Sequence, residues 1–140
     1  MIKILPAINS QTFDECQQKI NLLKDLTKEF HLDISQSNFA NYNTWRNPQE
    51  LDKLDQDLKL QLHLMLILKP PEILKWNKDI VKSFILHLEA TSFPDALLRF
   101  ARRTKKKIFI AWAPQQDDFI IKKYLKFVDG ILILGVKPGR

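Results

Sequence analysis

The sequence predicts an α/β domain in which parallel β-strands alternate with helices. Short apolar runs typical of strands are followed by segments whose apolar residues recur every three or four positions, as in an amphipathic helix. About six strand segments and five helical segments follow one another in this way. This alternation favours a parallel sheet with crossover helices, and several strand segments are nearly continuous apolar runs, as when both sheet faces are covered. No low-complexity linker interrupts residues 1–140, so we expect a single domain.

The first two strand–helix units are marked by helix caps as well as by periodicity. The first strand is expected over residues 2–8 and the second over residues 30–34. Thr12, with Glu15 three positions later, is a capping box for the helix between them. A polar loop is expected over residues 35–46. The inward stripe of the first helix is Phe13, Cys16, Ile20, Leu23 and Leu26 or Thr27. The second helix begins near Asn47, Pro48 and Glu50 and turns Leu51, Leu54 and Leu58 inward.

Four more strands follow in the same rhythm. They are expected over residues 60–66, 83–89, 107–112 and 130–136, with helices over residues 70–76, 93–103 and 117–127. Two architectures fit this pattern: an open doubly wound sheet and a closed eight-stranded barrel. Eight units of this length need at least roughly 200 residues, so a barrel would be incomplete after the sixth strand.

Composition and charge exclude several classes of protein. The 140 residues carry a net charge of +6, and the densest basic cluster, residues 102–107, has no aromatic platform beside it. We therefore expect a solvated helix end, which at most attracts an anionic substrate, and no nucleic-acid partner. The longest apolar run, residues 64–68, is far too short for a membrane span. A single cysteine, Cys16, and the lack of a secretory signal favour the cytoplasm.

Three histidines fall within the expected second, third and fourth strands. His31 and Asp33 are two residues apart and therefore share one face of a strand, as do His87 and Glu89. His63 lies among bulky apolar residues of the strand between them. A lone strand histidine is more often a hydrogen-bonded structural residue than a ligand. Three on adjacent strands, near the carboxyl ends where α/β proteins bind ligands, favour a functional site.

This set of side chains offers donors for a divalent metal. His31, Asp33 and His63 supply two imidazoles and one carboxylate, which suit Zn²⁺, Fe²⁺ or Mn²⁺ and leave positions open for substrate oxygens. A metal there would polarise a carbonyl and stabilise an enediolate, with Asp33 as ligand and base. His87 and Glu89 lie one strand further, where supporting hydrogen bonds or a purely structural role are expected rather than ligation.

The same motifs resemble the ribulose-phosphate 3-epimerase family, a branch of the TIM barrels that acts on sugar phosphates. His31-Leu32-Asp33-Ile34 resembles the family's His-x-Asp-Val, His63-Leu64-Met65 its His-Leu-Met, and His87-Leu88-Glu89-Ala90-Thr91 its His-x-Glu-Ala-Thr. Further similarity lies in residues 6–10, 111–114, 129–132 and 136–139, in the family's order.

This resemblance implies a TIM (β/α)8-barrel type that is incomplete, with about six β/α units and without the last two strands. It implies epimerisation at C3 of ribulose 5-phosphate and xylulose 5-phosphate through an enediolate. By resemblance, His31, Asp33 and His63 bind one divalent metal, Asp33 is catalytic, and Ser10, His63 and Met65 contact the sugar phosphate.

Two departures from the family pattern leave two functions open. Gln36 stands where the family has an aspartate, and the second catalytic carboxylate, expected on a seventh strand, is absent from these residues. The chain is then either a metal-dependent epimerase whose sequence stops early or a truncated, catalytically impaired relative that binds metal or a partner. Unpaired edge strands would favour a homo-oligomer.

Overall fold

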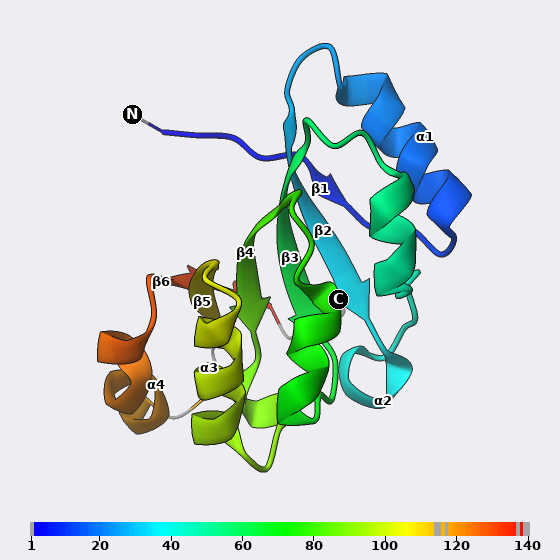
Figure 1. Cartoon of the computed structure of the whole chain (residues 1–140). Coiled ribbons are helices and arrows are strands. Elements are labelled where there is room, and N and C mark those ends of the chain that lie inside the picture. Colours follow the sequence, from blue (N-terminus) through cyan, green and yellow to red (C-terminus); the bar gives the residue numbers. More distant parts are fainter. Residues whose placement is uncertain (1, 114–115, 117, 137, 139–140) are drawn as a thin grey trace.

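The computed structural model describes residues 2–113, 116, 118–136 and 138 and contains one parallel β-sheet (Figure 1). The strand order is β1-β2-β3-β4-β5-β6, so every strand pairs with its neighbours in sequence. The strands within the described residues are β1 (Ala7–Ile8), β2 (Glu29–Ser35), β3 (Lys59–Met65), β4 (Val81–Leu86), β5 (Lys107–Trp112) and β6 (Gly130–Ile133).

The strand order separates the two architectures that the sequence left open. A doubly wound sheet reverses its strand order at a switch point, whereas a barrel adds each strand beside the previous one. The order here runs without a reversal from β1 to β6. The described residues therefore form part of a TIM-type barrel, which confirms the predicted fold class.

Helical segments connect successive strands and lie side by side along the sheet, with α1 at the β1 end and α4 at the β6 end (Figure 1). They are α1 (Phe13–Leu23), α2 (Ser37–Ala40), α3 (Pro94–Arg103) and α4 (Asp118–Tyr124), with 3-10 segments η1 (Pro48–Lys53), η2 (Pro70–Trp76), η3 (Leu88–Ala90) and η4 (Leu125–Phe127). Segment η2 packs against both η1 and α3.

Alternation along the strands separates the core from the site. Every second residue of the central strands is fully buried in the main apolar core, as in Phe30, Leu32, Ile34, Leu60, Leu62, Leu64, Phe84 and Leu86. The residues between them, including His31, Asp33 and His63, therefore point to the opposite face of the sheet. Because side chains alternate between the two faces of a strand, His31, Asp33 and His63 lie on the face opposite the leucine-rich face, which carries Leu32, Leu60, Leu62 and Leu64.

The start of α1 follows the predicted cap with one difference. The Glu15 backbone N–H donates to Thr12 Oγ1 at 3.2 Å, as expected of an N-cap threonine. The Glu15 carboxylate accepts from the Gln11 backbone N–H at 2.8 Å, one residue before the position that a capping box uses.

Several predicted boundaries are wrong. The first strand is Ala7–Ile8 rather than residues 2–8, because only the last part of that segment pairs with β2. The loop predicted over residues 35–46 contains α2, which ends where Asn41 turns left-handed at φ 60°. The fourth strand ends at Leu86, so His87 and Glu89 lie in the following turn. The sixth strand ends at Ile133 rather than at residue 136.

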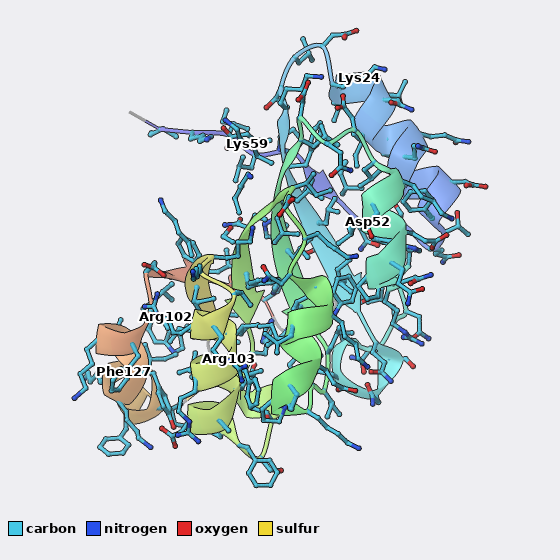
Figure 2. All side chains as sticks on the ribbon, in the orientation of Figure 1. Lys24, Asp52, Lys59, Arg102, Arg103 and Phe127 are labelled. Carbon is cyan, nitrogen blue, oxygen red and sulfur yellow. The ribbon has the colours of Figure 1, made fainter. Side chains whose placement is uncertain are left out.

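The basic cluster at the end of α3 takes part in the fold (Figure 2). The Arg102 guanidinium donates to the Phe127 carbonyl through Nη2 at 2.7 Å and pairs with Asp129 through Nη1 at 2.9 Å. Arg103 lies over the Phe100 ring, 5.1 Å from its centroid. These contacts tie α3 to the segment before β6. Among the described residues, no helix combines the length and apolar character that a membrane span requires.

We predict that the Cys16 thiol is unreactive in the folded protein. Burial in the α1 stripe raises the pKa of Cys16 to about 11, so almost no thiolate is present at neutral or mildly alkaline pH. A disulfide reagent such as DTNB should react slowly with native protein at roughly pH 8 and rapidly after guanidinium is added. Stoichiometric reaction within minutes without denaturant would contradict this packing.

Candidate metal centre

Strand register brings the polar motif of β2 directly beside that of β3. Asp33 pairs with His63, and His31 pairs with Gln61 two residues earlier. Because alternate residues share a face, all four side chains project from the same side of two hydrogen-bonded strands. The expected clustering of His31, Asp33 and His63 therefore occurs.

One carboxylate oxygen lies between the two imidazoles. Asp33 Oδ1 is 3.2 Å from His31 Nε2 and 2.9 Å from His63 Nδ1. The two rings meet edge to face with centroids 5.4 Å apart. One ligand atom from each of the three residues lies within 4.8 Å of the other two.

The second nitrogen of His31 is held by an amide. His31 Nδ1 is 2.9 Å from Gln61 Oε1. An amide oxygen only accepts hydrogen bonds, so His31 Nδ1 donates to Gln61, and Nε2 is the nitrogen that faces Asp33. A hydrogen bond from the outer nitrogen is the usual arrangement for a metal-binding histidine.

Opposed effects set the charge states of these groups. Burial raises the pKa of Asp33, but hydrogen bonds with His31 and His63 outweigh it and hold that pKa well below its usual range. Burial lowers the pKa of His31, yet hydrogen bonds with Asp33 and Gln61 raise it on balance. Burial dominates at His63 and lowers its pKa in spite of Asp33. The site thus holds an ionised carboxylate.

The donor set fits a divalent transition metal. Two imidazole nitrogens and one carboxylate oxygen converge, while the outer nitrogen of His31 is engaged elsewhere. Imidazole suits Zn²⁺ and Fe²⁺ and, with a carboxylate, Mn²⁺, and three protein ligands leave coordination positions open. His31, Asp33 and His63 are therefore the residues that would hold such an ion.

Of the two other residues expected at the substrate, Met65 lies on this face of the sheet, whereas Ser10 follows the end of β1. Met65, two residues after His63, is buried and pairs with Ser35 of β2. Ser10 follows β1, and its buried Oγ has no hydrogen-bond partner among the described residues. A buried hydroxyl without a partner is costly, which is expected where a ligand supplies the missing hydrogen bond.

Sequence reasoning missed two residues of the site. Gln61 lies two positions before His63 on the same strand face, so the period of two could have found it. Tyr42 comes from the predicted polar loop; its hydroxyl accepts from Asn9 Nδ2 at 3.0 Å. Burial raises the pKa of Tyr42, and the Asp33 charge raises it further. No periodic signal in the loop marked Tyr42.

Comparison with known families agrees with the arrangement of these residues. A sequence model described as the ribulose-phosphate 3 epimerase family matches residues 3–140. The match includes β1 to β6 and every residue placed at the site above. The motifs at residues 111–114 and 136–139 also fall within it, although Pro114, Lys137 and Gly139 lie outside the described residues.

Proposed function

The chain belongs to the ribulose-phosphate 3-epimerase family, and from this premise we propose that it catalyses metal-dependent epimerisation at C3 of ribulose 5-phosphate and xylulose 5-phosphate. One observation carries the proposal: the ligand atoms of His31, Asp33 and His63 converge within 4.8 Å on the face of β2 and β3. A site of two imidazoles and one carboxylate is suited to a hydroxyketone substrate, whose oxygens can complete the coordination of a cation.

The three residues would hold one divalent ion, with Zn²⁺, Fe²⁺ and Mn²⁺ as candidates. Such an ion, when bound, supplies positive charge that stabilises the oxyanion of an enediolate. The outer hydrogen bond of His31 to Gln61 orients that ligand before any ion arrives. The protein therefore contributes a largely preformed site.

Asp33 is proposed as the base that removes the C3 proton. Its low pKa keeps the carboxylate ionised and ready to accept a proton at neutral pH. The same low pKa makes it a weak base, so the proton must be acidified by the adjacent carbonyl of the substrate. Ser10 and Met65 would contact the sugar phosphate, the first through its unpaired hydroxyl and the second as a pocket wall.

A second candidate is a metal-binding relative with impaired catalysis. Gln36, in place of the family's aspartate, favours this candidate because an amide cannot supply negative charge. Inversion at C3 requires proton delivery to the face opposite the base, and Asp33 alone can only return a proton to the side it left. Proton exchange and inversion therefore distinguish the two functions.

The decisive experiment follows ribulose 5-phosphate by proton NMR in deuterated water with purified protein and added Mn²⁺ or Zn²⁺. Loss of the C3 proton signal together with appearance of xylulose 5-phosphate supports the epimerase. Exchange without inversion, or metal binding without exchange, favours the impaired relative. Absence of both exchange and metal binding contradicts the proposal.

Binding of a fitting metal should raise the melting temperature of the protein. An ion that binds only the folded state at 100 times its Kd adds about 2.7 kcal/mol, which for a chain of this length corresponds to about 9 °C. Differential scanning fluorimetry with Co²⁺ or Zn²⁺ against EDTA measures this shift. Mg²⁺ at the same concentration is the control, since it prefers oxygen ligands. Equal melting temperatures with Co²⁺, Zn²⁺ and EDTA would contradict the site.

A further inference from the structure

We propose that a cavity between α3 and the α4–η4 segment binds a nucleoside phosphate, a small molecule that joins a flat base to an anionic group. The cavity has a volume of ≈ 630 Å³, within the range of about 300–1,000 Å³ that is usual for small-molecule sites. Leu98 and Tyr124 line it and also belong to the main apolar core, on the leucine-rich side of the sheet. The cavity is therefore separated by the sheet from the proposed metal centre, and the inference does not depend on that centre.

Aromatic side chains form one wall of the cavity. Tyr124, at the end of α4, is buried, and Phe127, at the end of η4, is 48% exposed. Lys126 Nζ lies over one face of the Phe127 ring, 5.0 Å from its centroid, and leaves the other face for a flat ligand. The basic cluster over residues 102–107 has no aromatic platform beside it in the sequence, but the fold brings these two rings to it. Bases stack on such rings without regard to their identity.

Arg102 fixes the wall that carries Phe127. Its Nε and Nη2 donate to the Phe127 carbonyl oxygen at 3.0 and 2.7 Å, and its Nη1 is 2.9 Å from Asp129 Oδ2. Figure 2 shows Arg102 on α3 beside the segment of Phe127. Because Asp129 compensates its charge, Arg102 holds η4 against α3 and leaves the binding of an anion to its neighbours.

Two neighbouring arginines supply positive charge without a carboxylate partner. Arg99 and Arg103 both line the cavity from α3, four residues apart, and so lie next to each other on the helix surface. Within the part of the chain that the structure describes, neither forms an ion pair, and Arg103 lies over the Phe100 ring instead. Like charges at this spacing repel each other. A phosphate between them would remove that repulsion and accept charge-assisted hydrogen bonds from both guanidinium groups.

Contacts between the helical segments bridge the cavity at both ends. At the start of α3, Asp95 Oδ2 is 3.8 Å from Lys123 Nζ of α4, and seven residues later Arg102 reaches Phe127 and Asp129. At a rise of 1.5 Å per residue, the two bridges are about 10 Å apart along α3. A bound peptide helix or strand would need a groove that continues past these points. The bounded length favours a single small molecule.

The two walls together select the chemical class of that molecule. An inorganic anion would use only the unpaired guanidinium groups of Arg99 and Arg103, and an uncharged aromatic compound would use only the wall of Tyr124 and Phe127. A nucleoside phosphate uses both, with its base against Phe127 and its phosphate at the arginines. We therefore expect base and phosphate to contribute to binding together.

Chemical-shift mapping of ¹⁵N-labelled protein with adenosine 5′-monophosphate (AMP) tests the site in the unchanged chain. We expect AMP to shift amide signals of α3 and of residues 124–127, and to bind at least about ten-fold more tightly than adenosine or inorganic phosphate. A ligand of this size in an open cavity binds at about 10 µM to 1 mM. Absence of these shifts at about 5 mM AMP overturns the proposal. Inorganic phosphate or adenosine that binds as tightly as AMP overturns it as well.

Charge variants separate the cavity from the general positive charge of the chain. Arg99→Gln and Arg103→Gln should each weaken AMP binding about ten-fold, because each removes a charge-assisted hydrogen bond. Lys24→Gln is the matched control: it removes the same charge from the end of α1, and AMP affinity should stay within about two-fold. Equal affinities of all three variants for AMP overturn the role of the two arginines and with it the proposal.

An aromatic variant tests the other wall. Phe127→Ala should weaken AMP binding about ten-fold and leave the affinity for inorganic phosphate unchanged. Phe93→Ala, directly before α3, is the control, because Phe93 is also an exposed aromatic residue, at 65%, but does not line the cavity. Both positions are partly or largely exposed, so we expect both variants to fold. Equal AMP affinity in Phe127→Ala and Phe93→Ala overturns the proposal.

Removal of metal distinguishes this cavity from the proposed metal centre. Because the sheet lies between the two, EDTA should leave AMP affinity and the shifted amide signals unchanged. Loss of AMP binding in EDTA would place the nucleotide at the metal centre, which overturns this inference and leaves the proposed epimerase function standing. Failure of metal binding or of proton exchange at C3 leaves the prediction for AMP as it is.

Discussion

Replacing Asp33 with asparagine is expected to remove both metal binding and proton exchange at C3. Asp33 Oδ1 contacts both imidazole ligands. The asparagine amide would present either a neutral oxygen or an N–H group there, so the negatively charged metal ligand would be lost. Loss of a positioned base alone lowers the exchange rate about 10²- to 10⁴-fold. Deuterium exchange at C3 of ribulose 5-phosphate, followed by NMR, measures this rate.

The control for this variant is Asp25→Asn, which removes one negative charge from an exposed turn after α1. It should leave exchange and Co²⁺ affinity unchanged, because the change in net charge is identical and only its place differs. Circular dichroism establishes that both variants remain folded. Exchange that survives in Asp33→Asn at the rate of the unchanged chain removes Asp33 from the role of base.

Truncation of Phe84 to alanine is expected to cause a large loss of stability. Phe84 is fully buried at the centre of β4, where it pairs with Leu62 of β3 and Ile108 of β5. Phe→Ala changes in such cores cost about 3–5 kcal/mol, from lost burial and from the cavity that remains. A domain is stable by only about 5–15 kcal/mol, so this single change removes a large share of that free energy.

Urea unfolding followed by far-UV circular dichroism measures the loss, and Leu22→Ala provides the comparison. Leu22 is 80% exposed on α1, so its truncation should change the free energy of unfolding by less than about 0.5 kcal/mol. Similar unfolding midpoints for Phe84→Ala and the unchanged chain would contradict the packing of β4 between its neighbours.

The elements with a strong local signal were predictable from the sequence. Alternating apolar and polar residues marked β2 and β3, a nearly continuous apolar run marked β5, and a threonine cap with an apolar stripe marked α1. The order of strands was not predictable from these patterns, because alternation alone is compatible with a sheet that reverses its order and with one that does not. The resemblance to the epimerase family favoured the barrel over the doubly wound sheet, and the strand order of the structure agrees with it.

Within the site, the sequence indicated which residue types meet but not their hydrogen-bond partners. The two-residue spacing of His31 and Asp33 fixed their common face, and their meeting with His63 required only that β2 and β3 pair. Register was needed to find Gln61, since it decides which residue stands opposite His31. The sequence predicts a strand position for His87, whereas in the structure this residue directly follows the end of β4 and its ring stacks on that of His63 with centroids 5.0 Å apart.

Because Asp33 pairs in register with His63, metal binding reports whether β2 and β3 have paired correctly. A slip of β3 by one residue against β2 would turn His63 toward the leucine-rich face and bring a leucine beside Asp33. Such a chain would keep extended strands but would turn Leu60, Leu62 and Leu64 out of the core and lose its cation-binding ability. Uptake of Co²⁺ should therefore separate correctly paired molecules from compact misfolded ones that circular dichroism does not distinguish.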